Sequence, residues 1–180
     1  WKGHLDKIFP SPATIKKVKH HPSLPYSEMN AFINTIQNKE GMVAKCLYAL
    51  VLIGARSGEI RQMRWSEIDL QRGVWNAPDT TMKMKKAHAF PLSKQVVAFL
   101  KEHERYDGVD YVFPSFTSKT GFLSENAFKK IMIESEVSNY TVHGFRATFR
   151  TWAAEQTAFP RAEIELCIAH DTASDVERAY

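Results

Sequence analysis

The chain has 180 residues, of which 44% are hydrophobic and 24% are charged, and its formal net charge is +4. These values are ordinary for a soluble globular protein, and the length allows one full core, so we expect a single main domain. The mildly basic charge permits a polyanionic partner without requiring one. The longest apolar run, residues 47–53, is far too short to cross a membrane, so we expect neither a membrane span nor a signal peptide.

The two cysteines indicate the compartment. Cys46 and Cys167 both lie in apolar helical patterns, which is typical of buried free thiols in a reducing environment. We therefore expect a cytoplasmic protein. The chain begins at Trp1 and stops at Tyr180 inside a helical pattern, so we also expect it to be a fragment of a longer protein.

Residues 1–24 have the composition of a linker, because prolines interrupt any helix there. Five residues of this segment form a basic cluster: Lys16, Lys17, Lys19, His20 and His21. The two adjacent histidines lack the i,i+4 spacing of a helical metal site. The cluster is either a solvated linker or an arm that lies on DNA phosphates.

Two helices and a loop follow this segment. Apolar spacing predicts a helix over residues 27–36, and residues 42–53 are apolar nearly all round, which predicts a central buried helix. Arg56 comes next, on a loop between two glycines, and Ser57 is placed to cap the following helix. Glu59 is placed to orient the Arg56 guanidinium, although a local ion pair at the surface is the alternative.

The middle of the chain changes to short strands. Alternating apolar residues predict strands near residues 68–70, 74–75 and 87–90, with turns between them. The basic run 83–86 then lies at the tip of a small antiparallel sheet. The lysines of such a tip have three alternative roles: they are solvated, they insert into a DNA groove, or one of them donates a proton there.

The remaining elements are mostly helical. Ser93 is predicted to cap a helix that ends by residue 107, residues 111–114 form a short buried segment, and Ser124 is predicted to cap another helix. Later helices are predicted after residue 143, from Pro160 to Ile168, and from residue 174 to the end. The aromatic stripe of the first of these three helices is expected in the core: Phe145, Phe149 and Trp152. The fold class is therefore mainly α with one small antiparallel sheet.

His143 and Arg146 form the motif around which the chain is organised. Residues three apart share one face of a helix, and both lie in a first turn if the helix begins at Thr141 or Val142. The free N–H groups of a first turn favour an anion, and an imidazole beside a guanidinium suits a phosphate. The motif alone is a weak signal, since a solvated histidine beside a surface arginine gives the same pattern.

Five motifs occur in a fixed order: Arg56-Ser57-Gly58-Glu59, Lys83, His143-Gly144-Phe145-Arg146, Ala169-His170 and Ala179-Tyr180. This set resembles the tyrosine recombinase (phage integrase) family, particularly the integrases of satellite phages and genomic islands. The resemblance runs from about residue 24 to Tyr180. It implies a catalytic domain over residues 25–180, truncated at its C-terminus, and a basic linker over residues 1–24 from an absent DNA-binding domain.

The resemblance also implies roles for individual residues. Arg56 and Arg146 correspond to the catalytic arginines, Glu59 to the acidic residue that supports the first of them, and Lys83 to the hairpin lysine. Lys83 lies eight residues before Pro91, as the family pattern places it, with Lys85 and Lys86 as rivals and as expected DNA contacts. The remaining catalytic positions are the histidines and the nucleophile: His143, His170 and Tyr180.

Such a set suits metal-free phosphoryl transfer. The resemblance implies that the tyrosine attacks a DNA phosphate and keeps the bond energy in a 3′-phosphotyrosyl link, while two guanidiniums stabilise the charged transition state. We expect no cofactor and no metal, since no carboxylate cluster suits Mg²⁺. The expected partners are double-stranded attachment sites, a homotetramer of the full-length protein on DNA, and accessory DNA-bending or excision factors.

Other functions remain open from the sequence. A degenerate recombinase would bind DNA without cutting it, and a type IB topoisomerase would use a similar site to relax supercoils. A phosphate-binding domain unrelated to DNA and a plain helical scaffold are further alternatives, for which five ordered motifs leave little room.

Overall fold

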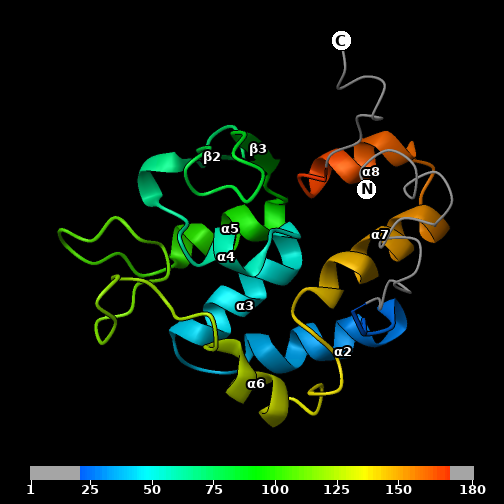
Figure 1. Ribbon diagram of the computed structural model, residues 1–180, viewed down its shortest axis with the longest axis horizontal. Helices are drawn as coiled ribbons and strands as arrows, with labels where there is room; N and C mark the ends of the chain where they lie inside the picture. The colour runs from blue at the N-terminus through cyan, green and yellow to red at the C-terminus, as the bar shows by residue number, and fades with distance from the viewer. Residues whose placement is uncertain (1–20, 171–180) are drawn as a thin grey trace, which may run out of the picture.

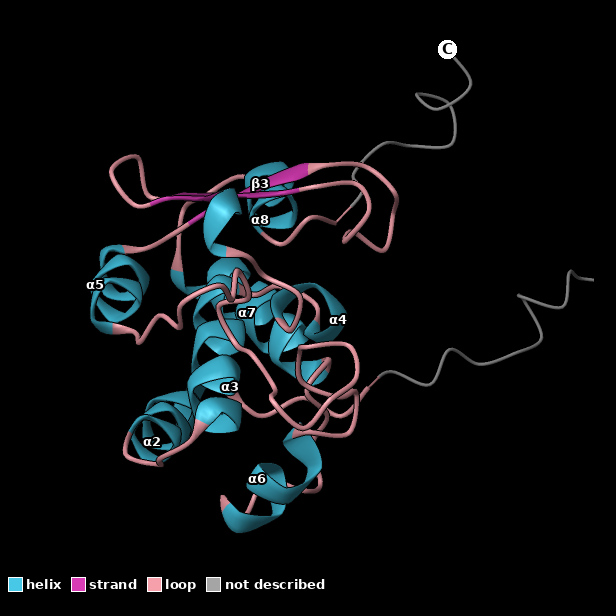
Figure 2. Cartoon of the chain, turned by 90° about the vertical axis from the view of Figure 1, so that its left-hand side faces the viewer, coloured by secondary structure: helices cyan, strands magenta, loops and turns pink. Residues whose placement is uncertain are grey.

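The computed structural model describes residues 21–170 of the chain, so the predictions for Lys16, Lys17, Lys19, the helix from residue 174 and Tyr180 lie outside the described residues. Within this range, the structure is mostly helical and has one three-stranded antiparallel sheet with the order β1-β2-β3, which confirms the predicted fold class. The sheet lies at one end of the molecule and α6 at the other, with α3 between them (Figures 1 and 2). None of the helices in this part of the chain combines the length and apolarity needed to cross a membrane.

The core is built around α3 (Met42–Ile53), as the sequence predicted. α2 (Tyr26–Gln37) packs along it, and α5 (Lys94–Glu102) and α6 (Phe128–Glu134) contact it from other sides. A helix that is apolar on every side is stable only when neighbours cover it all round. This helix is therefore a rigid platform for the loop that follows it.

The small sheet covers a second part of the core. β1 (Ile68–Asp69) pairs with β2 (Val74–Ala77), and β2 pairs with β3 (His88–Pro91). Trp75 lies opposite Phe90 in the register, and their rings stack with centroids 4.8 Å apart. Both rings are fully buried, so this cross-strand pair anchors the sheet and the connection between β2 and β3.

Of the three predicted serine caps, one is confirmed. The prediction for Ser57 is wrong, because Ser57 is the first residue of its helix, residues 57–60, and Arg56 occupies the N-cap position. Ser93 caps α5, because its hydroxyl accepts a hydrogen bond from the Val96 N–H at 3.3 Å. The prediction for Ser124 is wrong, since α6 begins only at Phe128. Ser124 instead starts a turn, in which its backbone carbonyl accepts from the Ala127 N–H at 3.1 Å.

α7 (Gly144–Gln156) carries the second half of the predicted motif and packs on α2 and on α8 (Arg161–Cys167). Phe145 of α7 stacks on Phe32 of α2 with ring centroids 5.0 Å apart. Both rings are buried, so they fix the first turn of α7 against the core.

The core position predicted for Trp152 is wrong, because this side chain is 43% exposed. The last turn of α7 is level with the first residue of α2, where the Gln156 side chain donates to the Tyr26 hydroxyl at 3.2 Å. In this part of α7 the buried residue is Ala153, so the buried face of the helix passes beside Trp152.

The two thiols are both free. Cys46 lies on α3 with no exposed surface, and burial raises the pKa of its thiol. The buried position predicted for Cys46 is thus confirmed. Cys167 is only half-buried, because it is the last residue of α8.

Gly54 ends α3 in the left-handed conformation, with φ +72°, and a Cβ there would lie 2.9 Å from Cγ2 of Ile168. We expect Gly54→Ala to lower the free energy of unfolding by about 1–2 kcal/mol from backbone strain alone, with the contact to Ile168 adding to the loss. Gly108→Ala is the matched control, since Gly108 has φ +73° and a Cβ at that position would meet no atom within 4 Å. Urea denaturation of both variants measures the difference, and equal losses would show that the approach of Ile168 is unimportant.

Candidate active site

Arg56 is held at the start of α4 (Ser57–Ile60), directly after the rigid end of α3. The Glu59 carboxylate accepts hydrogen bonds from the Arg56 backbone N–H and from Arg56 Nη1, each at 3.0 Å. The Glu59 residue is only 1% exposed. The expected contact is therefore present, and the alternative of a solvated surface pair is wrong.

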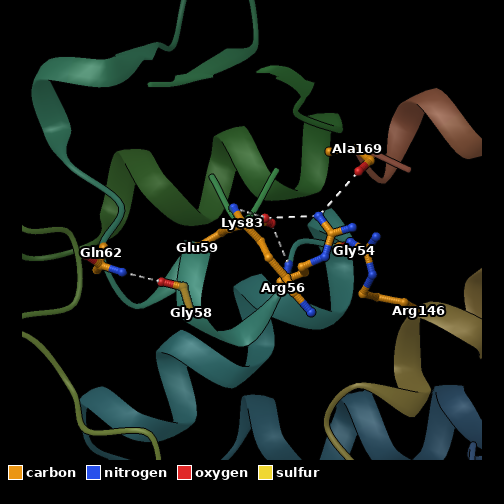
Figure 3. Close-up of polar contacts among 8 residues, drawn as sticks. All are labelled: Gly54, Arg56, Gly58, Glu59, Gln62, Lys83, Arg146 and Ala169. Carbon is orange, nitrogen blue, oxygen red and sulfur yellow. Dashed lines mark hydrogen bonds and ion pairs between the residues drawn. The ribbon is translucent and has the colours of Figure 1, made fainter. Parts of the chain in front are cut away.

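The lysine run lies in the connection between β2 and β3, as predicted. Met82 is buried and anchors this connection, while the side chains of Lys83, Lys85 and Lys86 are exposed. The Lys83 N–H points to the Glu59 carboxylate, with 3.4 Å between N and Oε1. Of the three lysines, Lys83 is thus the one whose backbone is joined to the partner of Arg56 (Figure 3).

The start of α7 is fixed by the segment that precedes α2. The Thr141 hydroxyl accepts from the Gly144 N–H at 2.9 Å, and the Thr141 N–H donates to the Pro22 carbonyl at 3.0 Å. A Cβ on Gly144 would collide with that same carbonyl, so only glycine permits this approach. His143 and Arg146 consequently lie at the first turn of the helix, as the spacing predicted.

Arg146 is a buried cation, with 5% of its surface exposed. Its Nη1 donates to the Gly54 carbonyl at 2.6 Å, and among residues 21–170 no carboxylate forms an ion pair with it. Burial lowers the pKa of Arg146 to about 10, and the positive charge of Arg56 adds to this effect. The two guanidinium groups are thus near enough for their charges to interact (Figure 3).

The imidazole of His143 belongs to the same electropositive region. Its ring packs edge-on against His21 with centroids 4.8 Å apart. Partial burial lowers the pKa of His143, and the positive charges of His21, Arg146, Arg56 and Lys83 lower it further. The tertiary structure therefore brings four of the predicted site residues close enough for their charges to interact.

His170 is connected to Arg56 through the backbone of the preceding residue, Ala169. The Ala169 carbonyl accepts from Arg56 Nη1 at 3.3 Å, which ties the end of α8 to the first arginine (Figure 3). The His170 ring is bound by Glu165, with 2.7 Å between Nδ1 and Oε2.

Two residues at the site were not predicted from the sequence. His88 on β3 lies close enough to Glu59, Arg56 and Arg146 for their charges to affect it. Burial lowers the pKa of His88, the Glu59 carboxylate opposes this shift, and both arginines add to it. Its Nε2 is buried and has no hydrogen-bond partner within the described range. Strand alternation was the available signal, because His88 shares a face with the buried Phe90.

Glu165 is the second missed residue. It is 5% exposed and accepts from both Arg150 and His170. The available signal was Ile168, a buried residue three positions later, because residues three apart share one face of a helix.

The arrangement is suited to an anion. Within residues 21–170, no group of three or more His, Cys, Asp or Glu side chains is placed to hold a metal ion. Two adjacent guanidiniums with an imidazole beside them present planar N–H donors of fixed direction, which match the oxygens of a phosphate group.

Comparison with known proteins identifies the family to which the chain belongs. Residues 22–180 match the phage integrase family. The chain is 28% identical to the integrase of Enterobacteria phage P4 over 91% of its own length and 42% of that protein. It is 30% identical to the prophage integrase IntZ of Escherichia coli (strain K12) over 84% of its length and 38% of that protein. The chain thus spans less than half the length of these relatives.

Solved structures share the fold at low sequence identity. A lambda integrase tetramer bound to a Holliday junction matches with a TM-score of 0.63 and 14% identity, over 95% of this chain and 54% of that chain. The resemblance inferred from the ordered motifs is confirmed by the family match. The chain therefore belongs to the phage integrase family, and its fold is that of a tyrosine recombinase catalytic domain.

Proposed function

We propose that this chain is the catalytic domain of a site-specific DNA recombinase, which cleaves and rejoins DNA strands through a 3′-phosphotyrosyl intermediate. The observation that carries the proposal is the buried Arg146, which lies beside Arg56 without a carboxylate partner among the described residues. A buried, unpaired charge is costly, and a second positive charge beside it raises the cost. A DNA phosphate bound between the two guanidiniums supplies the missing negative charge.

Each site residue then has a chemical role. Arg56 and Arg146 bind the non-bridging oxygens of the scissile phosphate and stabilise the charge that grows in the transition state. The Tyr180 oxygen forms a bond to phosphorus while the bond to the 5′ oxygen breaks, and Lys83 gives the leaving oxygen its proton. His143 and His170 donate hydrogen bonds at the phosphate or handle the tyrosine proton.

The location of Lys83 supports its assignment over its two rivals. Its backbone is joined to Glu59, the partner of Arg56, and its charge acts on His143. Lys85 and Lys86 are left to contact the DNA backbone, where exposed lysines release counterions from neighbouring phosphates.

The parent protein is proposed to act on duplex attachment sites as a homotetramer with accessory DNA-bending or excision factors. The lambda integrase structure with the same fold is a tetramer bound to a Holliday junction, which supports DNA as the partner. Residues 25–180 form the catalytic domain in this proposal. Residues 1–24 are a basic linker whose Lys16, Lys17 and Lys19 contact DNA phosphates.

The nucleophile is tested with Tyr180→Phe in the full-length protein, on a nicked duplex that carries the attachment site and traps covalent adducts. We expect unchanged DNA affinity and no covalent adduct, because phenylalanine lacks the attacking oxygen. Tyr106→Phe is the control, since the Tyr106 hydroxyl contacts Glu104 at 2.7 Å in an exposed loop, and its adduct should form normally. Affinity is read by gel shift and the adduct by denaturing gel.

The alternatives give different results in this assay. Wild-type protein that binds the site but forms no adduct would be a non-enzymatic DNA-binding module. Relaxation of supercoiled DNA without paired sites or a multimer would indicate a type IB topoisomerase. An adduct formed by Tyr180→Phe would place the nucleophile elsewhere.

A further inference from the structure

Glu165 is a buried carboxylate around which three basic side chains gather. Its oxygens lie 2.7 Å from His170 Nδ1, 2.6 Å from Arg150 Nη2 and 3.8 Å from Arg161 Nε. The Glu165 side chain is 6% exposed, whereas Arg161 is 86% exposed and reaches it only from the rim. A carboxylate in this position must be paired to remain ionised, and His170 and Arg150 provide the two short contacts.

The backbone of α8 reinforces the contact with His170. The Glu165 carbonyl accepts from the His170 N–H at 2.9 Å, so the same residue holds both the backbone and the ring of His170. Ala169 between them adopts φ +52°, a left-handed turn that brings His170 back over the end of the helix. One residue thus determines where the imidazole lies and how it is turned.

The contact also determines which ring nitrogen carries the proton. An ionised carboxylate can only accept a hydrogen bond, so Nδ1 must be the donor. In the neutral ring, Nε2 is then unprotonated and free for another partner.

Two further contacts connect the end of α8 to the arginines of the proposed site. Arg150 lies one turn after Arg146 on α7, so Glu165 joins His170 to the helix that carries Arg146. The Ala169 carbonyl joins the adjacent residue to Arg56. The His170 ring is therefore tied to α7 through Glu165, and the backbone next to His170 is tied to Arg56.

We propose that Glu165 is a positioning residue, which fixes His170 in the Nδ1–H tautomer and aims its Nε2 at the phosphate held by Arg56 and Arg146. The presence of a phosphate at this site rests on the proposed function, whereas the tautomer is a property of the free chain. Glu165 acts through His170 and touches no DNA.

The tautomer is measured directly by ¹⁵N NMR of the 180-residue chain labelled with ¹⁵N-histidine, at a pH of about 8.5, where histidine is ordinarily neutral. A His170→Asn variant identifies the signal. We expect wild-type His170 to show a protonated Nδ1 and an unprotonated Nε2, and Glu165→Gln to lose this preference. Arg161→Gln is the control, because Arg161 is an exposed residue at the rim, and it should keep the wild-type pattern.

Cleavage by the full-length protein provides the second readout. Glu165→Gln should slow adduct formation by about 10- to 100-fold without a change in DNA affinity, as loss of an orienting partner typically does. Arg161→Gln should cleave at the wild-type rate. A wild-type His170 protonated on Nε2 overturns the inference whether or not the protein cleaves DNA. The expected tautomer in a wild-type protein that forms no adduct would support the assignment of Glu165 and refute the proposed function instead.

Discussion

Replacing Arg146 with alanine should slow formation of the covalent DNA adduct by about two to three orders of magnitude, which is the usual loss when one preorganised donor to a transition-state oxyanion is removed. Arg146 is buried and its Nη1 is held at 2.6 Å by the Gly54 carbonyl, so the guanidinium is oriented before DNA binds. The measurement is the single-turnover rate on a nicked attachment-site duplex.

The control for this prediction is Arg105→Ala. Arg105 lies over the Trp65 ring, with its guanidinium carbon 4.0 Å from the ring centre, so the variant loses the same charge at a different place. It should cleave at nearly the wild-type rate. A wild-type rate for Arg146→Ala would contradict the role of Arg146 in binding the phosphate.

Stability separates a catalytic role of Arg146 from a structural one. Its folded pKa of about 10 lies below the ordinary value for arginine, so the unfolded chain binds more protons between the two values. The contribution of Arg146 to stability therefore rises as the pH increases through this window. At neutral pH, burial of the charged side chain lowers the free energy of unfolding of the DNA-free protein. Arg146→Ala should consequently unfold in urea at a concentration equal to or above that of the wild type. A large loss of stability would show that Arg146 mainly supports the fold.

Replacing Glu59 with alanine should lower the free energy of unfolding by about 3–5 kcal/mol, the usual cost of removing one partner of a buried ion pair. The carboxylate is 1% exposed, and it accepts from the backbone and side chain of Arg56 and from the Lys83 N–H. Its loss leaves the Arg56 guanidinium without a carboxylate partner and uncaps α4. The measurement is urea denaturation at neutral pH.

A surface carboxylate provides the comparison for Glu59. Glu134 lies 3.9 Å from Lys39 and 3.6 Å from Lys130, and its side chain is 45% exposed. Glu134→Ala should change the free energy of unfolding by less than about 1 kcal/mol, since solvent screens such pairs. Similar losses for Glu59 and Glu134 would mean that burial of the Arg56–Glu59 pair adds little to its strength.

Features that depend on neighbours along the chain could be predicted from the sequence. The central helix α3, the Ser93 cap and the Arg56–Glu59 contact were all predicted, because they arise from residues three or four apart or from continuous apolar patterning. The same reasoning failed for Trp152, because packing against other elements decides which residues of α7 are covered. The family was also determined by the sequence, since the order of five motifs is a linear property.

The assembly of the site was decided by tertiary packing. The Gly54 carbonyl that holds Arg146 is 92 residues away in the chain, and the Ala169 carbonyl that holds Arg56 is 113 residues away. Backbone carbonyls have no sequence signature, so no pattern indicates which of them will meet a guanidinium. For the same reason His88 went unpredicted, because the charged groups around it come from other elements. Glu165 contacts Arg161 and His170, which are near it in the chain, but its contact with Arg150 depends on the packing of α8 against α7. The sequence by itself thus determined most local elements and the chemical groups. Only the packing of distant segments brought those groups close together, because contacts between distant residues depend on how whole helices and strands fit together.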